Sequence, residues 1–127
     1  MIGTVDDYGR ALCFITVRHP ATSVTVTLQA WIDTGFTGGV MLTRSQISGL
    51  GLSATAAARG TLADGTQTLF ETYSCLVDWF GHVRNIEALG GSGRFALIGV
   101  GLLEDLRLTI DYPAKAVSLD PSPSLPP

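Results

Sequence analysis

The chain has 127 residues, 46% of them hydrophobic and 15% charged, with 15 glycines and a formal net charge of -3, which predicts one well-buried, strand-rich globular domain. The negative charge and the lack of any Lys or Arg cluster argue against nucleic acid as the main partner, because phosphate binding needs clustered cations. No apolar run reaches membrane-spanning length and no leader-like segment opens the chain, so we expect a soluble cytoplasmic protein without a membrane partner.

A hairpin is predicted before the first motif. Residues 12–17 are apolar, and residues 24–30 alternate Val, Leu and Ala with Thr and Gln, which is the period of a half-buried strand. A turn at residues 18–21 joins these two strands. The second strand leads directly towards Asp33.

Asp33 is the first candidate for chemistry, because it follows an apolar run and precedes Thr34 and Gly35. Its carboxyl is therefore expected where a buried strand ends in a tight turn. An acid held against a core is costly to ionise unless it is hydrogen-bonded or shares a proton. Gly35 allows close backbone approach and the Thr34 hydroxyl can donate and accept. An Asp-Thr-Gly turn also occurs without function, as an acid that caps backbone amides, so the tripeptide alone decides nothing.

The remaining elements are short. One helix is predicted from an N-cap at Thr43 through about residue 50, and a second helix at residues 100–106. Residues 54–71 are small and polar around an Asp64-Gly65 turn, which predicts a projecting hairpin. The other predicted strands span residues 40–42, 73–79, 83–89, 95–98, 108–111 and 116–119.

The glycine-rich segment at residues 90–94 superficially resembles a phosphate-binding loop. It lacks the lysine and the glycine spacing of such loops, so we interpret it as a flexible connection. We expect one domain at residues 1–120, followed by a Pro-rich disordered tail at residues 121–127.

Cys13 and Cys75 are the two cysteines of the chain, and both lie in apolar runs. Neither belongs to a motif with the spacing of metal ligands. We therefore expect buried, reduced thiols rather than a disulfide, and no metal.

The segment from Ile32 to Gly38 resembles the active-site turn of the retropepsin-like aspartic proteases, especially of their small prokaryotic members. That family has a second motif downstream, in which two apolar residues and a glycine lead into a short helix. Leu97, Ile98 and Gly99 fit this motif, although Val100 and Gly101 follow where the retroviral enzymes have Arg and Asn. With the intervening hairpin, the resemblance covers roughly residues 12–119.

The resemblance implies an all-β fold, namely a closed acid-protease barrel with one or two short helices, a flap hairpin and half of an active site in each chain. It implies an aspartic endopeptidase that needs no metal or organic cofactor. The implied catalytic residues are Asp33, Thr34 and Gly35. The implied substrate contacts are Phe36, Ala63, Asp64, Gly65, Thr66 and Ile98.

A catalytic pair needs two acids, and the sequence has one in the required setting. Asp64 lies in the predicted hairpin turn, while Asp78 and Asp111 are not followed by Thr-Gly. A two-fold homodimer would place Asp33 beside its own copy, so we expect a homodimer that cleaves an extended peptide or protein. The alternative is a catalytically silent dimeric β-barrel that binds peptides or a partner protein.

Overall fold

The computed structural model describes residues 1–122, so most of the tail expected at residues 121–127 lies outside the described part of the chain. The described residues form ten strands and two helices. These are β1 (Ile2–Val5), β2 (Ala11–Arg18), β3 (Thr25–Ile32), β4 (Val40–Thr43), α1 (Arg44–Leu50), β5 (Ala56–Thr61), β6 (Gln67–Trp79), β7 (His82–Gly91), β8 (Ala96–Ile98), α2 (Val100–Leu103), β9 (Leu106–Asp111) and β10 (Ala116–Pro121).

Six strands close into a barrel. Their order is β6-β7-β4-β8-β3-β2, and an antiparallel pairing between β2 and β6, with Val17 opposite Val77, completes the ring. Both of these valines are fully buried. The closed all-β barrel with two short helices confirms the predicted fold class.

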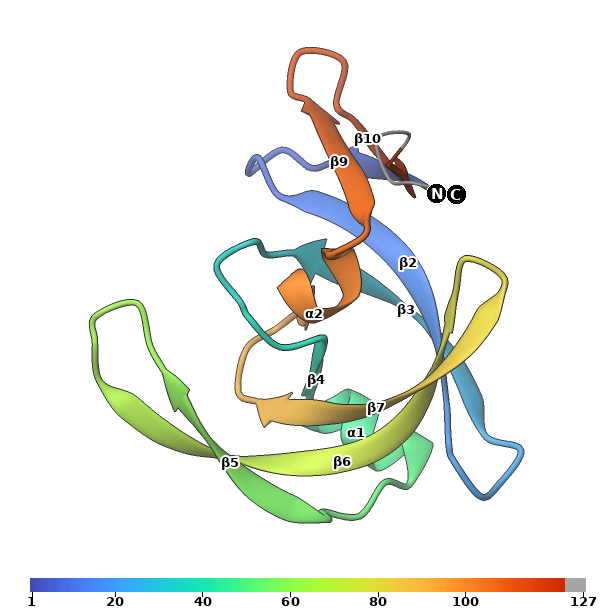
Figure 1. Ribbon diagram of the computed structural model, residues 1–127, viewed down its shortest axis with the longest axis vertical. Coiled ribbons are helices and arrows are strands. Elements are labelled where there is room, and N and C mark those ends of the chain that lie inside the picture. Colours follow the sequence, from blue (N-terminus) through green and yellow to red (C-terminus); the bar gives the residue numbers. More distant parts are fainter. Residues whose placement is uncertain (123–127) are drawn as a thin grey trace.

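A smaller sheet extends from the barrel. β1 pairs with β2 on one side and with β10 on the other, and β9 follows as the outer strand. These strands lie at one end of the molecule, beyond α2 (Figure 1). β1 was not predicted, because its four residues have no alternating pattern.

The core is filled mainly by aliphatic side chains, together with Trp79 and the two cysteines, which are buried free thiols as expected. Burial raises the pKa of Cys13 and of Cys75 to about 11, so both thiols are protonated at neutral pH. Within residues 1–122, no helix has the length and apolar character needed to cross a membrane.

Helix α1 begins and ends as the sequence predicted. The Thr43 hydroxyl accepts a hydrogen bond from the Gln46 N–H at 3.2 Å, and the Gln46 side chain accepts one from the Thr43 N–H at 2.9 Å. This reciprocal capping box satisfies two N–H groups that the helix itself leaves without partners. Gly51 ends the helix in the left-handed region, with φ of 70°.

Three predicted boundaries were wrong. Helix α2 ends at Leu103 rather than at residue 106, because Leu106 begins β9 and pairs with Pro121. Strand β10 consequently includes Pro121, which was assigned to the tail; the proline lies beyond the end of β1, so its missing N–H interrupts no pairing there. Gly90 and Gly91 are not a loose connection, because they end β7 and pair with Leu42 and Thr43.

Strands β5 and β6 form the predicted hairpin, which extends away from the barrel (Figure 1). Gly65 has a φ of 87° in its turn, a conformation that favours glycine. Asp64 accepts hydrogen bonds from the Thr66 hydroxyl at 2.6 Å and the Thr66 N–H at 2.9 Å, and these bonds lower the pKa of its carboxyl. The turn is thus held by local interactions.

Candidate active site

Asp33 lies directly beyond the end of β3, in the middle of the barrel sheet. β3 runs parallel to β8 with Ile32 opposite Ile98, and the Asp33 N–H donates to the Ile98 carbonyl at 2.8 Å. The chain then leaves β3 and returns as β4 on the other side of β8. The acid is therefore positioned by two segments that are far apart in the sequence.

In the turn that follows Asp33, a backbone N–H points at the Asp33 carboxylate. The Gly35 N–H donates to Asp33 Oδ1 at 2.9 Å, and the Phe36 N–H donates to the Asp33 carbonyl at 3.1 Å. A Cβ atom at Gly35 would lie 3.2 Å from the same carboxylate oxygen, so a glycine keeps this approach unobstructed. Asp33 is half-buried and Thr34 is exposed, so both side chains remain accessible.

The Thr34 hydroxyl has no hydrogen-bond partner anywhere in residues 1–122. Hydroxyls in the interior of a fold are almost always paired, whereas an exposed one is free to bind water or another molecule. Thr34 therefore presents an unused donor and acceptor next to Asp33.

The second motif and the residues that follow it form backbone hydrogen bonds with the segment that follows Asp33. The N–H groups of Gly99, Val100 and Gly101 donate to the carbonyls of Gly39, Phe36 and Gly38, at 2.9, 2.8 and 3.0 Å respectively. A Cβ at Gly99 would lie 2.3 Å from the Gly38 carbonyl oxygen and 2.4 Å from that of Phe36. The position therefore requires glycine for space, since its own backbone is extended.

Two predicted substrate contacts serve the scaffold in this structure. Ile98 is fully buried between β3 and β4, so its assignment as a substrate contact was wrong, and it holds the acid through its carbonyl. Phe36 is half-buried, and its ring fills the space beside Gly38 and Gly99, where added Cβ atoms would each lie 2.6 Å from ring carbons. An apolar residue such as Ile98 can either contact substrate or pack in the core. Because β8 lies between β3 and β4, Ile98 packs in the core.

Sequence reasoning missed a cluster of two aromatic rings and an arginine around Trp31, which precedes the candidate acid by two residues. Trp31 is 38% exposed and meets Phe95 edge-on, with 6.4 Å between the ring centroids. The Arg10 guanidinium lies 5.7 Å from the Trp31 ring and 4.3 Å from the Phe95 ring, and it pairs with Asp6 at 2.6 Å. The only sign of this cluster in the sequence was the aromatic residue Trp31, two positions before Asp33.

The other carboxylates of interest are engaged elsewhere. Asp78 accepts two hydrogen bonds from Arg18, at 2.9 and 2.6 Å, and Asp111 accepts one from the Ala114 N–H at 3.0 Å. The residues at the tip of the hairpin, Ala63, Asp64, Gly65 and Thr66, are all exposed, and no hydrogen bond within residues 1–122 joins them to Asp33. No group of three or more His, Cys, Asp or Glu in this range could hold a metal ion. A single chain thus offers one accessible carboxyl at this turn.

Comparison with solved structures identifies the fold. The structure of a retropepsin-like aspartic protease from Rickettsia conorii is similar with a TM-score of 0.65 and 20% identity, over 94% of this chain and 89% of that one. EIAV protease in complex with the inhibitor HBY-793 is similar with a TM-score of 0.55 and 18% identity, over 80% of this chain and 92% of that one. No protein-family model and no curated protein matches the sequence. The shared fold is that of the retropepsin-like aspartic proteases.

Proposed function

We propose that this chain, with its retropepsin-like fold, is an aspartic endopeptidase whose active site forms between two copies of Asp33 in a homodimer. One observation carries the proposal. Asp33 is accessible, receives the Gly35 N–H, and stands on a turn that Ile98 and the segment Gly99–Gly101 hold by four backbone hydrogen bonds. Such rigid support is what a group needs if it is to act at a fixed position.

Two copies of the chain are needed because catalysis of this kind uses two carboxyls, and one chain has only Asp33 at this turn. Asp64, Asp78 and Asp111 are each hydrogen-bonded within their own regions, so none is available beside Asp33. A two-fold axis through the turn would bring the second carboxyl from an identical chain. The unpaired hydroxyl of Thr34 supports the same arrangement, because it could bond the backbone of the opposite turn.

The chemistry follows from the pairing of the two acids. Two carboxyls about 3 Å apart cannot both ionise cheaply, so they hold one proton between them. The ionised carboxyl takes a proton from a bound water, while the protonated carboxyl polarises the carbonyl of the peptide bond. Water then attacks the carbonyl carbon directly, without a covalent intermediate and without the help of a metal or organic cofactor.

The substrate would be an extended peptide. Its backbone would lie between the Asp33 turn, lined by Gly35, and the hairpin tip at residues 63–66, which would close over it and exclude water. The free, buried thiols of Cys13 and Cys75 support a reducing compartment such as the cytoplasm.

The deciding experiment replaces Asp33 by asparagine, which keeps the shape of the side chain but removes its acid. Cleavage of a peptide library, followed by mass spectrometry, should fall at least about 100-fold, because general acid–base catalysis contributes 10²–10⁴-fold. The circular dichroism spectrum should stay unchanged, and Asp105→Asn, which alters an exposed acid outside the turn, should cleave normally.

Equal cleavage by wild type and Asp33→Asn would refute the proposal. Peptide binding by a wild-type dimer that cleaves no member of the library would instead support the alternative, a silent binding module.

A further inference from the structure

Two arginines border a hollow of about 240 Å³ where two chain segments leave the barrel sheet together. β4 and β7 run parallel and end with Thr43 opposite Gly91, so the next residues, Arg44 and Ser92, start side by side. The hollow lies between the first residues of α1 and the turn that joins β7 to β8. Its lining includes Arg44, Ser45, Gly91, Ser92, Gly93 and Arg94.

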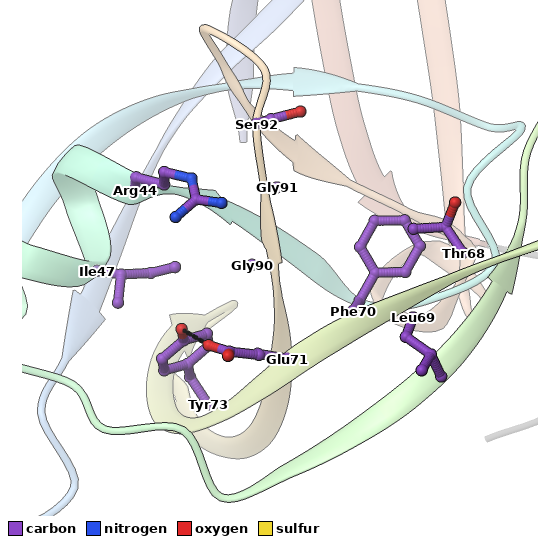
Figure 2. Close-up of a pocket in the computed structure, with 10 residues that line it drawn as sticks. All are labelled: Arg44, Ile47, Thr68, Leu69, Phe70, Glu71, Tyr73, Gly90, Gly91 and Ser92. Carbon is purple, nitrogen blue, oxygen red and sulfur yellow. Dashed lines mark hydrogen bonds between the residues drawn. The ribbon is translucent and has the colours of Figure 1, made fainter.

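A second hollow of about 330 Å³ adjoins the first and shares Arg44, Gly91 and Ser92 with it. Its far wall is the middle of the β5–β6 hairpin, where Leu69 and Phe70 of β6 line it. Figure 2 shows the Arg44 side chain reaching from α1 towards the strand that carries Gly90 and Gly91, with Phe70 on the opposite side. The two hollows together form a groove with two arginines at one end and the side chains of Leu69 and Phe70 at the other.

The paired glycines leave the floor of this groove as bare backbone. A Cβ at Gly90 would lie 2.9 Å from Tyr73 Cε2 and 3.3 Å from Ile47 Cδ1, and a Cβ at Gly91 would lie 2.5 Å from Met41 Sδ. Side chains at either position would displace residues that shape the groove. Gly90 and Gly91, which resembled part of a phosphate-binding loop in the sequence, thus allow a ligand to approach the backbone closely.

The charges in the groove are unbalanced. The three ion pairs within residues 1–122 engage Arg10, Arg18 and Lys115, whereas Arg44 and Arg94 take part in none. No carboxylate lines the smaller hollow. The one acid in the larger hollow, Glu71, accepts a hydrogen bond from the Tyr73 hydroxyl at 2.7 Å.

We infer that this groove binds an acidic side chain of the peptide substrate, and this inference rests on the proposed endopeptidase function. Two unpaired guanidinium groups with neighbouring serine hydroxyls match a carboxylate, which accepts several hydrogen bonds at once. The adjoining apolar wall of Ile47, Leu69 and Phe70 matches the neighbouring residues of a peptide rather than a bare inorganic anion.

The groove is connected to the Asp33 turn through β4 (Val40–Thr43). Val40 pairs with Ile98, whose carbonyl accepts the Asp33 N–H, and the strand ends at Thr43, which lines the smaller hollow. At about 3.3 Å for each residue, the strand spans on the order of 10 Å. An extended peptide bound at the Asp33 turn therefore needs only a few further residues to reach this region.

The test measures binding separately from cleavage. The protein is the uniformly ¹⁵N-labelled Asp33→Asn variant, which should not cleave the added peptide. It is titrated with a capped octapeptide that has two glutamates among apolar residues. A second peptide, in which both glutamates are replaced by glutamines, is titrated in the same way. The glutamate peptide should bind about three- to tenfold more tightly at low salt, shift the amide signals of residues 91–94, and lose this advantage near 1 M salt.

Arg44→Gln and Arg94→Gln should each reduce the preference for glutamate. Arg84→Gln is the matched control, because it removes an exposed cation of β7 that also lies in no ion pair and outside the groove. Equal binding of the two peptides, or a preference that survives both groove variants, would overturn the inference. So would saturation of the same signals by inorganic phosphate alone with no effect of either peptide, which would indicate a small-anion site.

Failure here would leave the cleavage test of Asp33 untouched. Conversely, a clear glutamate preference in a protein that cleaves nothing would retain the acidic-peptide site while removing the endopeptidase.

Discussion

The backbone N–H of Asp33 donates a 2.8 Å hydrogen bond to the carbonyl of Ile98, which joins the two motifs of the sequence at one point of the barrel. The candidate acid therefore owes its position to a strand near the other end of the chain. The three N–H groups that follow Ile98 complete the support of the same turn. Substitutions in the second motif should consequently affect the first.

Gly99→Ala should destabilise the protein by about 1–3 kcal/mol, the usual cost of adding a methyl group to a site without room. The new Cβ would meet two backbone carbonyl oxygens, at 2.3 and 2.4 Å, and neither oxygen can move without displacing the Asp33 turn. Chemical denaturation followed by circular dichroism measures this free energy of unfolding.

Gly49→Ala is the matched control for that substitution. Gly49 lies within α1, and apart from its chain neighbours and the backbone of that helix no atom of the described residues lies within 4 Å of the position that its Cβ would take, so alanine should stabilise the helix by up to about 1 kcal/mol. A Gly99→Ala protein as stable as wild type would show that the two motifs are not tightly coupled.

Local signals predicted most of this architecture. The capping box around Thr43, the Asp64-Gly65 turn and the alternation leading to Asp33 each depend on residues close in sequence, and the structure bears out all three. Ile98 was misassigned because burial of an apolar residue depends on which strands flank it, and these are β3 and β4. Ile98 is part of the core because of the strands that pair with β8, which the local sequence does not reveal.

Other features depended entirely on contacts between distant segments. β1 is a strand because β2 and β10 lie on either side of it, and its own four residues carry no periodic pattern. Leu106 belongs to β9 rather than to a helix because Pro121 pairs with it across the hairpin. Arg44 and Arg94 share a hollow only because β4 and β7 end in register.

Thr34→Ala should weaken the proposed dimer while leaving the fold of each protomer intact. The hydroxyl has no partner within residues 1–122, so its loss should change the free energy of protomer unfolding by less than about 0.5 kcal/mol. If two symmetric hydrogen bonds join the turns, their loss should raise the dimer dissociation constant roughly five- to 100-fold. Thr34→Ser keeps the hydroxyl and should behave nearly as wild type. Equal dissociation constants for the alanine variant and wild type in analytical ultracentrifugation would exclude this role.

The ion pair between Arg18 and Asp78 should make stability depend on pH. It connects β2 and β6, the strands whose pairing closes the barrel, and the hydrogen bonds from Arg18 hold the pKa of the Asp78 carboxyl below its usual value. Because the pKa is lower in the folded state, the stabilisation is present above the unfolded pKa of about 3.9 and is lost as the pH falls through the folded value.

Asp78→Asn should accordingly be less stable than wild type at pH 7, with a difference that shrinks as the pH falls below about 4. Urea denaturation at several pH values measures this difference. Asp7→Asn is the control, because that acid pairs with Lys115 but its side chain is 89% exposed, and such pairs contribute little. A difference for Asp78→Asn that stays constant between pH 7 and pH 2 would contradict the assignment.

Subunit mixing tests the central claim, that each active site draws one Asp33 from each of two chains, most directly. A fixed amount of wild-type protein is allowed to exchange subunits with a ninefold excess of Asp33→Asn protein, and peptide cleavage is then measured. If both carboxyls are required, random pairing leaves about one tenth of the wild-type chains in intact pairs, so cleavage should fall to about one tenth. Cleavage that stays at the level of the wild-type protein alone, after exchange has been demonstrated, would contradict the account.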